Sequence, residues 1–196
     1  MGDAPRFHAE DRAQWSAWLE QHAAEVPGVW LVPWKKASGR PVLSYEQAVS
    51  EALAFGWVDS KGSKLDDQRT MLWFTRRKRG SGWARPNKRR IAELEAAGLM
   101  TDAGRRVVEA AKADGSWSLL DDVEDLVVPD DLAAALTTVP GSREHWEAFP
   151  RSAKRALLEW IVQARTAPTR AKRIARTAEA AGRGERANQW RPKATG

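Results

Sequence analysis

Apolar residues near the start of this chain recur first with the spacing of a helix and then with that of a strand. Trp15, Trp18, Leu19 and His22 fall at i, i+3, i+4 and i+7, which places them on one stripe of a predicted helix over residues 9–25. Residues 29–34 alternate instead, as a half-buried strand does. The change of period predicts a helix followed by a strand.

The next segment carries signals for a helix and a strand pair. Ser44 with Gln47 three residues later is the pattern of a capping box, and it predicts a helix that ends at Gly56. Residues 57–60 and 69–78 read as two strands joined by the polar loop between them. Because that connection is short, the two strands are predicted to be antiparallel.

Helical signals dominate the remainder of the chain. Pro86 suits a first helical turn, Gly98 suits a helix end, and Thr101 suits the start of another helix. Beyond an acidic stretch, four more helices are predicted near residues 130–139, 142–149, 151–165 and 168–182.

These elements predict an α+β fold: a small, mainly antiparallel sheet packed with helices, followed by a helical C-terminal module. The predicted organisation is an α+β domain with an aromatic and basic cleft at residues 1–115, an acidic connector at 116–129, and a helical module with a polar tail at 130–196.

Composition removes several classes of function. The chain has no apolar run near the roughly twenty residues that cross a bilayer and no signal-peptide core, so a cytoplasmic protein without a membrane span is expected. The absence of cysteine excludes disulfides, thiolate metal sites and cysteine nucleophiles. His8, His22 and His145 are far apart in sequence, so no metal site is predicted. Phosphate-loop, dinucleotide and nucleophile-elbow motifs are absent, and no cofactor is expected.

Charge and aromatic residues converge on one segment. The formal net charge is +6, and residues 76–90 contain eight Lys or Arg and no acid. Trp57, Trp73 and Trp83 lie within or beside this segment and offer flat apolar area with an N–H donor. Arginine offers a planar set of donors suited to carboxylate or phosphate. This combination predicts a site for an anionic ligand.

The candidate ligand-binding residues have four predicted roles. Stacking, charge binding and orientation by hydrogen bonds are assigned to nine of them, and Asp59 is expected to organise the basic groups through an ion pair with Arg69, Arg77 or Lys64. Trp57, Trp83, Arg77 and Lys78 are predicted to line one concave surface. The nine residues are Trp34, Trp57 and Trp83 for stacking, Lys35, Arg77 and Lys78 for charge, and Tyr45, Ser81 and Asn87 for orientation.

Short segments spread over nearly the whole length of the chain form a recognisable pattern: Leu31 to Lys36, Ser38-Gly39, Leu43 to Tyr45, Ala48 to Ala52, Phe55 to Ser60, Lys64 to Asp66, Phe74-Thr75, Arg77-Lys78, Ser81, Trp83, Asn87, Phe149 to Lys154, Trp160-Ile161 and Asn188 to Trp190. In these segments the chain resembles the YdeI/OmpD-associated family, also labelled bacteriocin-protection proteins. The resemblance implies a soluble bacterial protein linked to tolerance of antimicrobial peptides and envelope stress, with no catalytic mechanism assigned. The chain has Arg76 where the family usually has Pro, and Ala84 where it usually has Ser.

Residues and resemblance together favour a cytoplasmic binding protein over an enzyme. The predicted partner is an anionic small molecule or a peptide carboxylate, in a role in antimicrobial-peptide or envelope-stress tolerance. A nucleic-acid-binding protein is the first alternative, using residues 76–90 and the basic residues of the C-terminal module, because clustered Lys and Arg also suit phosphates. An enzyme of unassigned reaction is the second alternative.

Overall fold

A computed structural model describes residues 4–188 of the chain. The chain divides into two compact units, residues 1–117 and 118–196, and each unit has its own hydrophobic core. The fold class is α+β, as the sequence predicts. Among the described residues no helix has the length and apolar character needed to span a bilayer.

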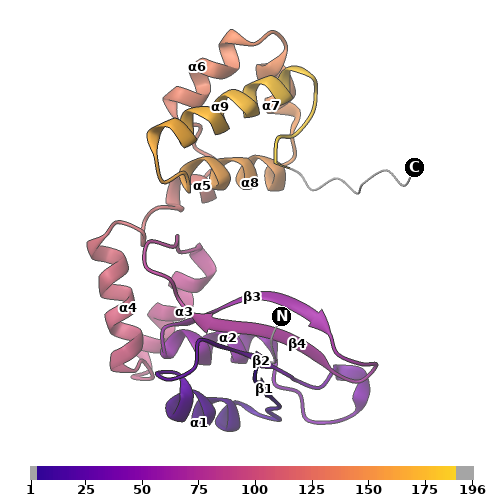
Figure 1. The fold of residues 1–196 in the computed structure, drawn as a ribbon, viewed down its shortest axis with the longest axis vertical. Helices are drawn as coiled ribbons and strands as arrows, with labels where there is room; N and C mark the ends of the chain where they lie inside the picture. The colour runs from indigo at the N-terminus through magenta and orange to yellow at the C-terminus, as the bar shows by residue number, and fades with distance from the viewer. Residues whose placement is uncertain (1–3, 189–196) are drawn as a thin grey trace. The chain divides into compact units, whose positions relative to one another are not determined.

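The first unit contains a four-stranded mixed sheet in the order β1-β2-β4-β3 (Figure 1). β2 pairs with β4 and β4 with β3 in antiparallel fashion, whereas β1 runs parallel to β2. The strands are β1 (Arg6–Phe7), β2 (Gly28–Leu31), β3 (Trp57–Lys64) and β4 (Thr70–Arg76).

The helices of this unit begin and end where the sequence signals lie. Ser44 and Gln47 form the predicted capping box, and Thr101 caps the following helix through Gly104 N. Gly56 and Gly98 adopt positive φ at the ends of helices, a conformation that glycine allows without strain. The helices are α1 (Arg12–His22), the 3₁₀ turn η1 (Lys36–Ser38), α2 (Tyr45–Ala54), α3 (Arg85–Ala96) and α4 (Asp102–Ala113).

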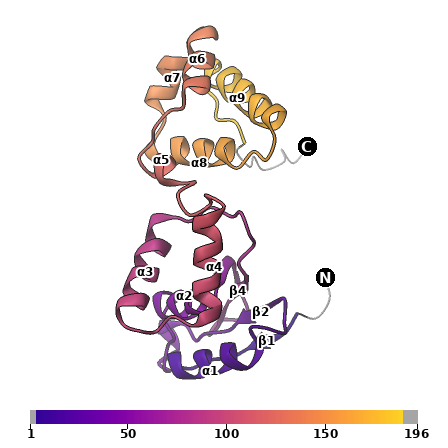
Figure 2. The ribbon, with the colours of Figure 1, turned by 90° about the vertical axis from the view of Figure 1, so that its left-hand side faces the viewer.

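The sheet buries one face and leaves the other partly covered. Val29 and Phe74 are opposite each other in the register and both are fully buried in the core. On the other face Trp30 contacts Trp73, with ring centroids 5.2 Å apart. α3 and α4 both pack against α2 on the core side (Figure 2).

The second unit is helical throughout its described part. Each of its described helices contributes apolar residues to the core, in which Trp146 and Leu132 are fully buried. The helices are α5 (Asp121–Glu124), α6 (Asp130–Thr138), α7 (Ser142–Ala148), α8 (Arg151–Val162) and α9 (Ala167–Gly182).

Some elements differ from the sequence prediction. The stretch 116–129 contains α5, and Leu120 and Val123 within it are buried in the core of the second unit, so these residues do not form a simple connector. β3 continues to Lys64 through residues that were expected to form a loop. Their backbone pairs with β4, and their polar side chains are exposed at the edge of the sheet. β1 was not expected. The Gln189 and Trp190 of the family resemblance lie outside the described residues.

Candidate functional site

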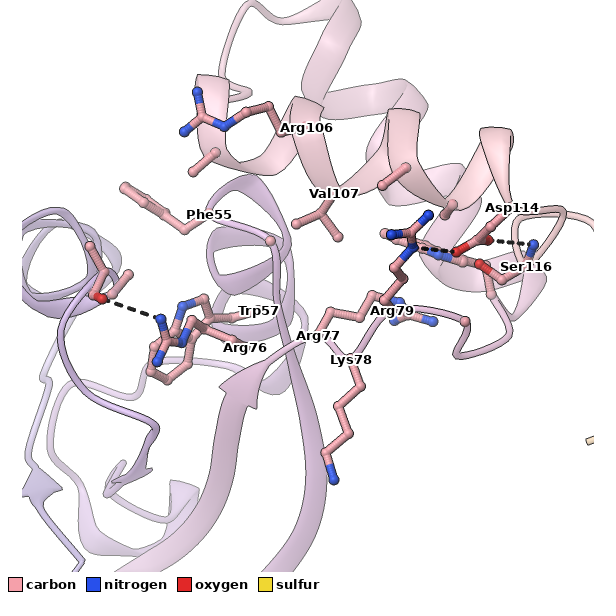
Figure 3. Close-up of a pocket in the computed structure, with 18 residues that line it drawn as sticks. Phe55, Trp57, Arg76, Arg77, Lys78, Arg79, Arg106, Val107, Asp114 and Ser116 are labelled. Atoms are coloured by element: carbon pink, nitrogen blue, oxygen red, sulfur yellow. Dashed lines mark hydrogen bonds and ion pairs between the residues drawn. The ribbon is translucent and has the colours of Figure 1, made fainter. Parts of the chain in front are cut away.

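A pocket of about 360 Å³ lies in the first unit, between the end of β4 and α4 (Figure 3). We call it the Arg77 pocket. Trp57, Arg77, Lys78 and Trp83, which the sequence predicts to share one concave surface, all line it. The other lining residues are Ala23, Ala24, Phe55, Gly56, Arg76, Arg79, Gly80, Ala103, Arg106, Val107, Ala110, Ala111, Asp114 and Ser116.

Local backbone geometry places Arg77 in this wall. β4 ends at Arg76, and the Arg77 N–H donates to the carbonyl of Gly56 at 3.0 Å. Gly80 has φ of 74° and allows the chain to turn back toward Trp83. The turn therefore folds the arginine run over the tryptophan that follows it.

Arg77 stacks on Trp83. The guanidinium carbon lies 3.8 Å from the centroid of the indole ring, which is a close cation–π contact. The Arg77 Nη2 donates to the carbonyl oxygens of Ser81, at 3.5 Å, and of Gly82. These contacts fix the plane of the guanidinium.

Arg77 has no carboxylate partner among the described residues. Its Nε is buried and makes no hydrogen bond within residues 4–188. Its Nη1 also makes no hydrogen bond within these residues, but this nitrogen is not buried. Burial lowers the pKa of Arg77 to about 10, which leaves the side chain protonated at neutral pH. The result is a fixed, partly dehydrated cation with donor capacity to spare.

The other cations of the pocket are held to different degrees. Arg76 donates to the carbonyl of Ala24 at 3.2 Å, and Arg79 lies 3.5 Å from the carboxylate of Asp114. Asp114 is the only acid among the lining residues that the structure describes. Lys78 and Arg106 have no ion-pair partner within the described part of the chain; Figure 3 shows the Lys78 side chain extending away from α4. Positive charge therefore exceeds negative charge in this wall.

Trp57 and Trp83 do not offer free faces for stacking on a ligand, contrary to the sequence prediction. Each is 1% exposed and belongs to the core. Trp83 is covered by Arg77 and by Trp117, whose ring centroid is 5.0 Å away. Apolar area in the pocket comes instead from Phe55 and Val107, which are only partly buried.

Three other predicted residues line a second, separate hollow. Trp34, Lys35 and Tyr45 border a groove of about 1010 Å³ beside β3 and α2, which we call the Trp34 groove. Its wall is mainly apolar and shares no residue with the Arg77 pocket. The single predicted site is thus divided in two by the fold.

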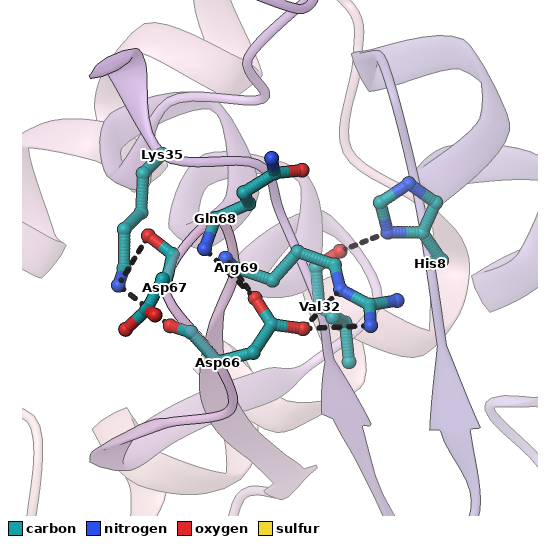
Figure 4. A network of polar contacts seen from close by, with 7 residues as sticks. All are labelled: His8, Val32, Lys35, Asp66, Asp67, Gln68 and Arg69. Atoms are coloured by element: carbon teal, nitrogen blue, oxygen red, sulfur yellow. Dashed lines mark hydrogen bonds and ion pairs between the residues drawn. The ribbon is translucent and has the colours of Figure 1, made fainter. Parts of the chain in front are cut away.

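Lys35 is engaged within the protein, so its predicted role as a free anion-binding cation is not what the structure shows. Its ammonium donates to the backbone carbonyls of Asp66 at 2.8 Å and Asp67 at 3.1 Å and ties down the β3–β4 loop (Figure 4). Trp34 lies beside two other cations, with the guanidinium of Arg40 4.7 Å from its ring centroid and that of Arg69 at 5.6 Å.

Asp59 does not pair with any of the three cations expected for it. It accepts a hydrogen bond from the Tyr45 hydroxyl at 3.0 Å, while Arg69 pairs with Asp66 and Lys64 with Asp67. Desolvation, and then the hydrogen bond to Asp59, raise the pKa of Tyr45. The contact between Tyr45 and Asp59 could not be predicted from the sequence, because the two residues belong to different elements and meet only in the folded chain.

A buried arginine missed by the sequence reasoning organises the neighbouring surface. Arg90 donates to both carboxylate oxygens of Glu46, at 2.6 and 2.7 Å, and to the Asn87 side chain at 2.7 Å. The hydrogen bond from Arg90 lowers the pKa of Glu46. Asn87 is therefore part of a structural network, and Ser81 likewise donates to a carbonyl, that of Lys78, at 2.7 Å. Neither residue lines the Arg77 pocket.

Sequence reasoning also missed the contribution of α4 to the pocket. Arg106 and Val107 stand next to each other on α4 and bring a cation and an apolar surface to the wall opposite β4. A helix starting at Thr101 was predicted here, but its packing against the arginine turn depends on tertiary contacts. In residues 4–188 no cluster of His, Asp and Glu is arranged to hold a metal ion.

Family comparisons divide the chain near the boundary of its two units. Residues 7–107 match the model of a family described as Domain of unknown function (DUF8412). Residues 125–184 match the model described as Bacteriocin-protection, YdeI or OmpD-Associated. No curated protein and no solved structure matches the chain.

The segments that carry the resemblance seen in the sequence are divided between the two matched ranges. The segments between Leu31 and Asn87 fall in the first match, and those from Phe149 to Ile161 fall in the second. The Arg77 pocket lies almost wholly in the first, with only part of α4 and the residues after it beyond the matched range. The segment 125–184 is thus similar to the YdeI/OmpD-associated, bacteriocin-protection family, in agreement with the resemblance seen in the sequence, and the chain belongs to the family of the DUF8412 domain, whose model matches more than half of it.

Proposed function

We propose that the Arg77 pocket binds an anionic small molecule or a peptide carboxylate. The observation that carries this proposal is Arg77 itself: a charged guanidinium fixed on Trp83, without a carboxylate partner among the described residues, in the wall of a pocket. The Nη1 group of this fixed guanidinium has no partner within residues 4–188, so it can donate a charge-assisted hydrogen bond to a carboxylate or phosphate oxygen.

The pocket also limits the size and shape of the ligand. Its volume of about 360 Å³ is near the lower end of small-molecule sites, which run from roughly 300 to 1,000 Å³. Phe55 and Val107 present apolar surface beside the cations. A ligand with one anionic group next to a compact apolar group fits both features.

The family of the second unit supports a biological setting for this binding. The match to the bacteriocin-protection family over residues 125–184 supports a role in which an antimicrobial peptide or a product of envelope stress is captured. A cytoplasmic location for this capture is part of our proposal. The nucleic-acid alternative has less support, because several cations of the two basic segments are already engaged within the chain: Arg90 with Glu46, Arg170 with Asp131, and Arg173 with the carbonyl of Trp160.

The direct test uses two ligands that differ only in charge. We expect N-acetylphenylalanine to bind the full chain in calorimetry and its amide to bind at least tenfold more weakly, since the amide lacks the anion. Phenyl phosphate, measured in parallel, ranks phosphate against carboxylate. Arg77→Lys keeps the charge but loses the planar set of donors, and a lost charge-assisted hydrogen bond of about 1.5–3 kcal/mol weakens binding roughly ten- to over a hundredfold.

Arg89→Lys is the matched control, because Arg89 lies outside the pocket and pairs with Glu93 on the surface of α3. It is expected to leave affinity unchanged. Thermal midpoints of both variants report on folding. The proposal would be contradicted if neither N-acetylphenylalanine nor phenyl phosphate bound at millimolar concentration. Equal affinity for N-acetylphenylalanine and its amide would contradict it as well.

A further inference from the structure

β3 forms one edge of the sheet, and its outer side has no partner strand in the described chain. The strand order ends at β3, which pairs only with β4, and residues 60–64 are exposed. An edge strand presents backbone N–H and C=O groups that an extended peptide can pair with. Edges of this kind recognise peptides by adding a strand.

Only the second half of the β3 edge is regular. A bulge interrupts the register between Asp59 and Lys61, and from Lys61 to Lys64 the pairing with β4 is continuous. Bulges and edge lysines also protect sheets from unwanted pairing. Because the regular stretch is so short, backbone hydrogen bonds alone cannot select a partner, and side-chain contacts must supply the specificity.

The Trp34 groove supplies an apolar contact on one face of this edge. Leu31, Leu72 and Gly62 form one row across the sheet, since Leu72 is opposite both of the others. All three border the groove. Gly62 leaves the row open at β3: a Cβ built there meets only the carbonyl oxygen of Met71, at 3.8 Å. Glycine inside a strand commonly marks the close approach of a ligand or another backbone.

The opposite face of the same edge is cationic. Lys61 is opposite Trp73, one row before Gly62, so its side chain lies on the other side of the sheet. Its ammonium is 5.3 Å from the centroid of the Trp30 ring, and no described carboxylate is within ion-pair distance of it. A strand added beside β3 would place alternate residues over the groove and beside Lys61.

We propose that the β3 edge binds an extended peptide segment of another protein in which apolar residues alternate with acidic ones. The apolar residues occupy the Trp34 groove above Gly62, and the acidic residues face Lys61. This site shares no lining residue with the Arg77 pocket, so it does not depend on the proposed function of that pocket.

The probe is a fluorescein-labelled hexapeptide of alternating aspartate and valine, measured by fluorescence anisotropy with the full chain. Gly62→Val fills the open position and is expected to weaken binding at least tenfold. Lys61→Glu is expected to weaken the aspartate peptide by a similar factor and to strengthen binding of a lysine–valine peptide. Lys172→Glu, a charge reversal at an exposed position of the second unit, is the matched control and is expected to change neither affinity.

Two further peptides test the strand geometry. A scrambled peptide with three valines followed by three aspartates, and a peptide N-methylated at alternate backbone nitrogens, are both expected to bind at least tenfold more weakly. Equal binding of either one would overturn the proposal. So would a dimer in sedimentation velocity that Gly62→Val converts to monomer, because the edge would then pair with a second copy. The reciprocal effect of Lys61→Glu on the two peptides cannot arise from misfolding.

Discussion

Ala84 is the N-cap residue of α3, where its methyl group has no oxygen to accept a hydrogen bond from the first helical turn. Its φ and ψ of −70° and 146° are those that a capping serine adopts. The resemblance noted from the sequence has serine at this position. The missing hydroxyl is therefore explained as a missing cap, and it need not belong to a binding site.

We predict that Ala84→Ser raises the free energy of unfolding by about 0.5–2 kcal/mol, the usual value of an N-cap. Urea unfolding followed by circular dichroism measures it. Thr101→Ala is the converse control, because the Thr101 hydroxyl accepts from Gly104 N at 3.2 Å and caps α4. This change is expected to destabilise by more than the value of a cap, because the same hydroxyl also donates to the carbonyl of Ala54 at 2.7 Å. No gain from Ala84→Ser would mean that the first turn of α3 is already satisfied.

At the same scale, the sequence predicted which residues gather in the Arg77 pocket better than how those residues are oriented. The neighbourhood of Arg77 and Trp83 follows from their closeness in sequence and the glycines between them. That the Trp83 indole keeps no free face does not follow from the sequence, because Trp117 contacts Trp83 from more than thirty residues away. Lys35 and Asp59 were misjudged for the same reason: their partners are set by tertiary packing.

Between elements, α4 approaches α2 closely. Gly104 lies in α4 against the end of α2, and a Cβ added to it would overlap the carbonyl group of Ala54, coming within 2.8 Å of its carbon. The same carbonyl accepts hydrogen bonds from the Thr101 side chain, at 2.7 Å, and from its backbone N–H, at 3.2 Å. The Ala54 carbonyl cannot move away from Gly104 without breaking these hydrogen bonds and separating α4 from α2.

Gly104→Ala is predicted to destabilise the protein despite the higher helix propensity of alanine. Propensity alone would add about 1 kcal/mol of stability. Overpacking against a fixed backbone typically costs about 1–3 kcal/mol and can cost more, and we expect it to prevail here because the obstructing group is a carbonyl.

Gly62→Ala is the matched control for this prediction, since the same chemical change meets open space there and is expected to be neutral or slightly stabilising. Thermal midpoints of the two variants measured side by side distinguish the effects. A higher midpoint for Gly104→Ala than for the unaltered chain would show that α4 can shift at little cost.

The elements themselves were largely predictable because their signals are local. Capping residues and glycines with positive φ mark the ends of α2, α3 and α4, and these helices lie where the sequence predicts them. β1 was missed because two residues give no periodicity, and it forms only by pairing with β2. The second half of β3 was missed because an exposed edge strand carries polar residues on both faces and resembles a loop.

For the whole molecule, two separate cores predict two folding units. The core of the first unit includes Trp15 and Phe74, whereas that of the second is centred on Trp146, Leu132 and Ile161. A chain of this size supports two modest cores, though a unit of fewer than about eighty residues is only marginally stable by itself.

We predict that residues 1–117 and 118–196, expressed separately, each unfold cooperatively, with the second fragment the less stable. Differential scanning calorimetry of the fragments and of the full chain measures this. The control is a division at residue 104, inside α4, which is expected to leave the first fragment unfolded. If neither unit of the natural division shows a transition, the two cores depend on each other for stability.

The Arg77 pocket is built into the end of the first unit. Ser116 lines the pocket, Trp117 packs on Trp83, and the next residue, Ser118, already belongs to the second unit. A displacement of the backbone at residue 118 would therefore act first on Trp117, whose backbone N–H donates to the carbonyl of Ala111 at 3.0 Å and whose ring lies against the Trp83 indole that supports Arg77. The pocket is therefore open to mechanical influence from the chain junction, and replacing Trp117 with phenylalanine would test it by removing the indole that packs on Trp83.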